Sequence, residues 1–237
     1  MPERPRGDLL LLTCEHGGNR IPAAYARVFR GAASVLASHR GWDPGALDVA
    51  RRLARRFRLR LFAVTWSRLL VEANRSPTNP RIWSSYTRDL PAEERQRILD
   101  RYWWPHRREV EEAVARGVER GRRVVHVAVH SFTPVLNGEI RTADIGLLYD
   151  SARSGERDFC RRWESLLAEA SPALRVRRNY PYRGAADGLP NWFRRRLPDR
   201  SYVGIELELN QNLLAGSCRR RTAAVVAESL QRLLGIP

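Results

Sequence analysis

The chain has 237 residues, 43% of them hydrophobic and 29% charged, which is enough apolar content for one α/β domain spanning residues 1–237. No apolar run is long enough to cross a bilayer and no secretory pattern opens the sequence, so we expect a cytoplasmic protein without a membrane partner. The formal net charge is +16, but its arginines are spread along helical faces and form no nucleic-acid-binding motif, so no nucleic acid partner is expected.

The first apolar run, residues 9–12, has the length of a buried strand and ends in a polar turn. His16 lies in this turn, just past the strand, where open α/β sheets place their ligands. Gly17 and Gly18 allow the backbone to turn tightly and allow a metal or a substrate to approach closely. The turn is therefore the first candidate for a functional site.

The next segments are predicted to be mostly helical. Residues 23–30 favour a short helix, and apolar spacing from Pro44 predicts a helix to residue 57. Asp43 precedes Pro44 and is the natural N-cap of that helix, yet its second oxygen could serve as a metal ligand. We then expect strands at 60–64 and 68–73, a long polar loop at 76–91, and a helix from Pro91 to about residue 120.

Residues 122–134 repeat the form of the opening segment, an apolar strand that ends in a histidine and a turn. His126 and His130 have the same strand parity, so both side chains are predicted to point to one face. His130 lies at the carboxyl end, where ligands bind, whereas His126 lies deeper and is predicted to be structural. His106, in the preceding helix, is predicted to be exposed or to pack in the core.

The last third of the chain alternates strands and helices and ends with two glutamates inside a strand. Ionised Glu206 and Glu208 are costly in an otherwise apolar strand unless they are paired or functional. The predicted elements are a strand at 145–149, a helix at 155–170, a strand at 175–178, a loop at 179–188, a strand at 202–210 and a helix at 219–234.

Alternating strands and helices predict a parallel or mostly parallel sheet with helices on both faces. His16, His130 and Glu208 then meet at the carboxyl ends of three strands, and the helix after Asp43 begins on the same side. Two imidazoles, one carboxylate and an open position match a catalytic site for one Zn²⁺ ion. Glu208 would be the general base that takes a proton from water on the metal.

Five motifs in this order resemble the N-formylglutamate amidohydrolase family: EHGGNRIP (15–22), SRLLVEANR (67–75), HSF (130–132), DIGLLYD (144–150) and ELELN (206–210). The resemblance implies a three-layer α/β/α sandwich of the zinc-exopeptidase type. It also implies metal-assisted hydrolysis of the amide bond in a small N-acyl amino acid such as N-formylglutamate.

The resemblance implies roles for residues at matching positions. His16, Asp43 and His130 would bind the metal, with Glu15 as the rival carboxylate because it adjoins His16. Glu208 would be the catalytic glutamate. The remaining assignments are Glu206 as the alternative general base, the Asn74–Arg75 pair as the grip on a substrate carboxylate, and Arg68 and Arg141 as further contacts to a dicarboxylate.

Two other functions are compatible with the sequence. One is an amidase for the stem amides of the cell wall, against which the missing export signal argues. The other is an arginine-rich binding protein on a hydrolase-like scaffold. Metal content after purification separates both enzymes from the binding protein.

Overall fold

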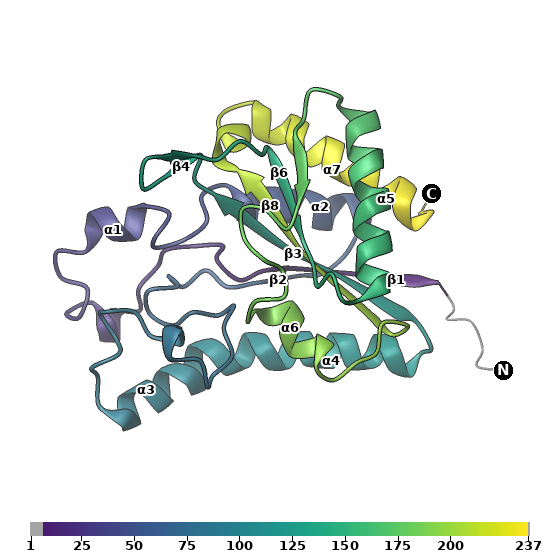
Figure 1. The fold of residues 1–237 in the computed structure, drawn as a ribbon. Helices are drawn as coiled ribbons and strands as arrows, with labels where there is room; N and C mark the ends of the chain where they lie inside the picture. The colour runs from purple at the N-terminus through teal and green to yellow at the C-terminus, as the bar shows by residue number, and fades with distance from the viewer. Residues whose placement is uncertain (1–6, 237) are drawn as a thin grey trace.

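The computed structural model describes residues 7–236 and contains a six-stranded sheet in the order β2-β1-β3-β8-β6-β7 (Figure 1). β1, β2, β3 and β8 are parallel to one another, whereas β6 pairs antiparallel with β8 and parallel with β7. The sheet is therefore mostly parallel, as predicted. Its strands are β1 (Asp8–Cys14), β2 (Leu61–Ala63), β3 (Arg123–Phe132), β6 (Ile145–Leu148), β7 (Val176–Arg178) and β8 (Tyr202–Asn210), and a separate hairpin pairs β4 (Val135–Leu136) with β5 (Glu139–Ile140).

Helices cover both faces of the sheet and complete a three-layer α/β/α sandwich (Figure 1). α2, α5 and α7 pack on one face, where alternate strand residues such as Leu12, Val127 and Ile205 are fully buried. α4 and α6 pack on the other face. The helices are α1 (Ala33–Ala37), α2 (Ala46–Phe57), α3 (Ala92–Ile98), α4 (Trp104–Glu119), α5 (Ser154–Ala170), α6 (Leu189–Arg194) and α7 (Cys218–Leu234).

Two predicted elements differ in the structure. Residues 23–30 form only a 3-10 turn at Ala23–Tyr25 followed by further turns. Residues 68–73 are not a strand: Leu70 and Val71 are buried in an apolar cluster beneath the loops, so their hydrophobicity reflects burial without sheet pairing. Two helices, α1 and α6, were not predicted.

The predicted long helix is divided into α3 and α4 by a π-helical turn at Leu99–Trp103. Pro105 lies in the first turn of α4 and has no backbone N–H to give to the carbonyl four residues earlier. The wider turn accommodates this missing bond. Within residues 7–236, no helix combines the length and apolarity needed to span a membrane.

Trp163 of α5 is the residue whose truncation should most weaken the sandwich. It is fully buried in the core, and its indole N–H donates to Ser229 Oγ at 3.0 Å. We expect Trp163→Ala to lower the free energy of unfolding by ~3–5 kcal/mol, measured by chemical denaturation. Trp104→Ala, at a half-buried position, is the control and should cost much less. Equal losses in the two variants would contradict the assignment of Trp163 to the core.

Candidate active site

The parallel pairing of β1 with β3 brings together two histidines that are far apart in the sequence. His16 lies two residues after the end of β1, and His130 lies two residues before Phe132, the last residue of β3. Asp43 joins them because its backbone N–H donates to the carbonyl of His16 at 3.0 Å. The site is therefore built where strand ends meet, as the sequence predicts.

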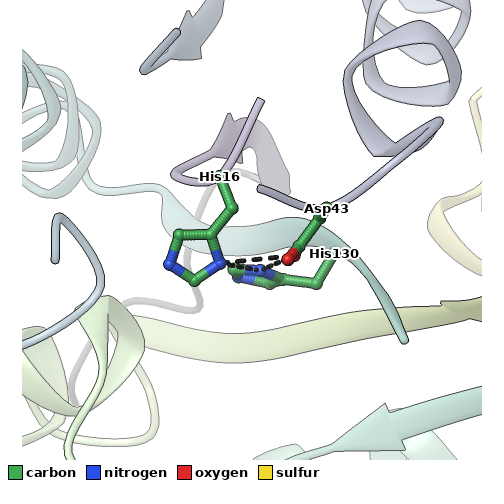
Figure 2. A group of neighbouring side chains, drawn as sticks. All are labelled: His16, Asp43 and His130. Carbon is green, nitrogen blue, oxygen red and sulfur yellow. Dashed lines mark hydrogen bonds and ion pairs between the residues drawn. The ribbon is translucent and has the colours of Figure 1, made fainter. Parts of the chain in front are cut away.

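His16, Asp43 and His130 point toward one another (Figure 2). Asp43 Oδ2 lies 3.2 Å from His16 Nδ1 and 2.9 Å from His130 Nδ1, and the two Nδ1 atoms are 3.2 Å apart. All three residues are buried, with 2–4% of their surface exposed. The backbone N–H of Ser131 also donates to Asp43 Oδ2, at 3.3 Å.

This set of donor atoms fits a zinc ion. Tetrahedral ligands ~2.0–2.2 Å from one ion lie roughly 3.3–3.6 Å from one another, close to the separations found here. Two imidazole nitrogens and one carboxylate oxygen are also donors that zinc binds in catalytic sites. The three residues leave one position of a tetrahedron for water or substrate.

The surrounding carboxylates favour positive charge at the cluster. Burial lowers the pKa of His130, but hydrogen bonds to Asp43 and Glu15 outweigh it and raise that pKa well above its usual range. Burial likewise lowers the pKa of His16, but Glu72 and Asp43 raise it overall. The same field that attracts a proton to these nitrogens would attract a metal cation.

Asp43 does not cap the following helix, contrary to the prediction. The N-cap of α2 is Gly45, which has a φ of 81°, and no side chain caps it. A Cβ at Gly45 would also lie 2.8 Å from the Cβ of Leu214. The Asp43 carboxylate instead faces the two imidazoles, so the two roles that the sequence allows do not coexist.

Glu208 and Glu206 extend toward the cluster from β8. Glu208 pairs in register with His130, and both glutamates have the strand parity of that histidine. Burial raises the pKa of Glu208 to about 7, with Asp43 and Glu206 adding to the effect and His130 opposing it. Among residues 7–236, Glu208 Oε2 has no hydrogen-bond partner. By contrast, Glu206 Oε1 accepts a hydrogen bond from Asn74 Nδ2 at 2.8 Å.

A cavity of about 400 Å³ opens over the cluster and is lined by both glutamates of β8. Of the four predicted substrate-binding residues, Arg68, Asn74 and Arg75 line it. Arg141 does not: its guanidinium donates to Tyr182 Oη at 3.0 Å and lies behind that ring. The structure thus brings three of the four predicted contacts to the cavity wall.

The three residues at the cavity wall differ in how many of their polar groups already bond to other residues of the protein. Asn74 uses both ends of its amide, because Oδ1 also accepts from the backbone N–H of Leu189 at 2.7 Å. Arg68 pairs with Glu72 at 2.6 Å and with Asp43 at 3.4 Å. Within residues 7–236, the guanidinium of Arg75 donates only to the carbonyl of Asp187, so it keeps most of its donors for another partner.

Two carboxylates lie next to Nε2 of the histidines, the nitrogen that points away from the cluster. The sequence predicted this position for neither of them. Glu72 Oε1 contacts His16 Nε2, and Glu15 Oε2 lies 3.1 Å from His130 Nε2. Glu15, the rival ligand, is thus on the far side of His130 from the cluster. The available signal for Glu72 was an acidic residue two positions before Asn74 in an otherwise apolar segment.

Three other expectations can be compared directly with the structure. His126 is structural, as predicted, since it contacts Thr13 Oγ1 at 2.8 Å and Tyr202 Oη at 2.6 Å. His106 is buried, as one of its two predicted roles required. The close approach at Gly18 is made by the chain itself, because a Cβ there would lie 2.5 Å from the carbonyl oxygen of Thr65.

In this mostly parallel α/β/α sandwich, histidines and carboxylates converge at the carboxyl ends of the strands, which is where α/β enzymes place their active sites. The sequence profile of the N-formylglutamate amidohydrolase family matches residues 9–215. The chain therefore belongs to the N-formylglutamate amidohydrolase family.

Two solved structures are similar to this chain along nearly all of its length. The gene product Atu2144 from Agrobacterium tumefaciens matches with a TM-score of 0.82 and 33% identity, covering 98% of this chain and 92% of that one. N-formylglutamate amidohydrolase from Ralstonia eutropha JMP134 matches with a TM-score of 0.68 and 21% identity, covering 97% and 93%, which is a likeness of fold. No curated protein matches the sequence.

Proposed function

We propose that this protein is a zinc-dependent amidohydrolase that cleaves the amide bond of a small N-acyl amino acid, such as N-formylglutamate. The observation that carries the proposal is the convergence of His16 Nδ1, His130 Nδ1 and Asp43 Oδ2 beneath a cavity. Glu208 also lines this cavity, and its Oε2 has no hydrogen-bond partner within residues 7–236. Family membership supports the reaction class. The chemistry of the donor set supports the metal.

His16, Asp43 and His130 would hold the ion. When bound, zinc supplies Lewis-acid polarisation of the acyl carbonyl and acidifies a water molecule. Glu208 accepts the proton of the attacking water at a carboxylate oxygen and then donates it to the leaving amino nitrogen. Its raised pKa suits both steps, because one group must be a base first and an acid later.

Arg75 is the contact best suited to bind a carboxylate of the substrate. Its guanidinium lines the cavity and has no carboxylate partner within residues 7–236. Arg68 also lines the cavity, but its positive charge is already matched by Glu72 and Asp43. The planar guanidinium fork binds both oxygens of a carboxylate at once.

The proposal is tested by elemental analysis of the purified protein, followed by assays on a panel of N-formyl and N-acetyl amino acids with added Zn²⁺. We expect about one zinc ion per chain and release of a free amino acid from an N-formyl substrate. Hydrolysis of cell-wall stem amides alone would indicate the amidase. Absence of both metal and turnover would leave a binding protein on this scaffold.

Arg75→Lys is expected to raise KM about 10-fold or more with little change in kcat, because the charge remains but the two-pronged geometry is lost. The measurement compares a free-acid substrate with the same substrate amidated at its α-carboxylate. The loss should be much smaller for the amidated compound. Equal losses for both compounds would show that Arg75 anchors the loop through Asp187 and does not bind the carboxylate. Arg81→Lys, at an exposed position, is the control.

A further inference from the structure

Each histidine of the cluster contacts a carboxylate through the nitrogen that points away from the cluster. For His16 this is Glu72, whose Oε1 contacts Nε2, and for His130 it is Glu15, whose Oε2 lies 3.1 Å from Nε2. The two carboxylates come from different parts of the chain. The same arrangement therefore occurs twice, once for each imidazole.

Both carboxylates are held on their other side as well. Glu72 accepts from Arg68 Nε at 2.8 Å and from the backbone N–H of Asn74 at 3.1 Å. Glu15 is 1% exposed, and its Oε1 lies 3.5 Å from Nε2 of His106. Hydrogen bonds therefore fix the position of Glu72, whereas Glu15 is enclosed between His106 and His130 at ion-pair distances.

Both ring nitrogens of each histidine lie near a carboxylate, with Asp43 Oδ2 at Nδ1 in both and Glu72 or Glu15 at Nε2. A neutral imidazole has one N–H and one lone pair, so a cation held at Nδ1 would leave the N–H on Nε2, where the outer carboxylate can accept it. The lone pair of Nδ1 would then face the cluster in both histidines. Glu206, the other carboxylate near His130 Nε2, lies 4.0 Å away and is engaged by Asn74.

We propose that Glu15 and Glu72 are positioning residues that hold His130 and His16 in the Nε2–H form and thereby set the affinity of the cluster for its metal. This inference rests on the proposed function, because it takes the two histidines as metal ligands. It gives Glu15 a different role from the one it would have as the carboxylate ligand. It also gives Arg68 a role beside Glu72 that does not require contact with the substrate.

The first test measures the wild-type protein and uses variants only to assign its signals. Long-range ¹⁵N–¹H spectra of the zinc-loaded, ¹⁵N-labelled protein report which nitrogen of each of its five histidines is protonated. We expect His16 and His130, assigned by comparison with their Ala variants, to be protonated on Nε2 and metal-bound through Nδ1. Protonation on Nδ1 in either residue would overturn the proposal, whatever happens to the variants.

The second test measures zinc affinity by competition with a chromogenic chelator. Glu15→Gln and Glu72→Gln are each expected to weaken zinc binding 10–100-fold, as removal of carboxylates behind ligating histidines typically does. Glu156→Gln is the matched control, because Glu156 is a fully buried glutamate that pairs with Arg194 and contacts no imidazole. Its zinc affinity should equal that of the wild type.

A charge-balanced variant separates proton placement from simple charge. Glu72→Gln combined with Arg68→Met removes a carboxylate and its guanidinium together and leaves the net charge unchanged. If Glu72 fixes the proton on His16, zinc binding stays weak in the double variant. Recovery of wild-type affinity would mean that Glu72 acts only by charge, which overturns the proposal for that residue.

The outcomes also separate this inference from the proposed function. If the wild type binds zinc and His130→Ala does not, but Glu15→Gln and Glu72→Gln bind it as tightly as the wild type, the proposed function stands and the positioning role is wrong. If the wild type binds no zinc under any loading condition, the proposed function fails first and the positioning role with it.

Discussion

Glu208→Gln is expected to lower kcat by ~10²–10⁴-fold while zinc content and substrate binding stay close to those of the wild type. Glutamine keeps the size and hydrogen-bonding capacity of the side chain but cannot accept the proton of the attacking water. Glu208 is suited to this role because it lines the cavity and its buried Oε2 has no hydrogen-bond partner within residues 7–236. Burial also holds its pKa near the pH at which a base works efficiently.

The control for this prediction is Glu206→Gln, on the same strand and with the same parity. Glu206 is held by Asn74, so its replacement should disturb the loop and KM more than the chemical step. Steady-state kinetics and elemental analysis on both variants distinguish the two residues. Near-normal kcat in Glu208→Gln together with a collapse of kcat in Glu206→Gln would exchange their roles.

The sheet and the strand-end histidines could be predicted because their signals are local. An apolar run that stops at a polar turn marks a buried strand and its carboxyl end together, and this holds for both β1 and β3. Parallel pairing then brings His16 and His130 to one edge without further information. Strand parity similarly places Glu208 on the face of His130.

The features that could not be predicted depend on long-range contacts. The segment around Leu70 has the composition of a strand, but it is buried in an apolar cluster, and no strand within residues 7–236 pairs with it. Asp43 has the position of an N-cap, but its side chain is oriented by residues 27 and 87 positions away. Glu72 and His16 are 56 positions apart in the sequence, and no pattern of apolar and polar residues predicts their contact.

Long-range contacts also explain why only three of the four predicted substrate-binding residues line the cavity. A sequence shows that Arg68, Arg75 and Arg141 are cations, but it does not show which of them the protein already neutralises. Arg68 is paired with two carboxylates, and Arg141 is held against Tyr182 and does not line the cavity. Of these three cations, only Arg75 both lines the cavity and lacks a carboxylate partner within residues 7–236, and tertiary contacts alone reveal this.

His130→Ala and His16→Ala are expected to weaken zinc binding by at least ~10²-fold and to abolish hydrolysis, since each removes one of three converging donor atoms. Elemental analysis after dialysis and chelator competition measure the loss. His39→Ala is the matched control, because His39 lines the same cavity but lies outside the cluster. It should retain zinc.

The two ligand variants should remain folded, because each imidazole lines the cavity and its removal leaves the apolar core of the sandwich intact. Far-ultraviolet circular dichroism and the melting temperature check this. Stoichiometric zinc in either variant would exclude that histidine as a ligand. If zinc persists in Asp43→Ala but is lost in Glu15→Ala, Glu15 becomes the carboxylate ligand, and the cluster must rearrange when the metal binds.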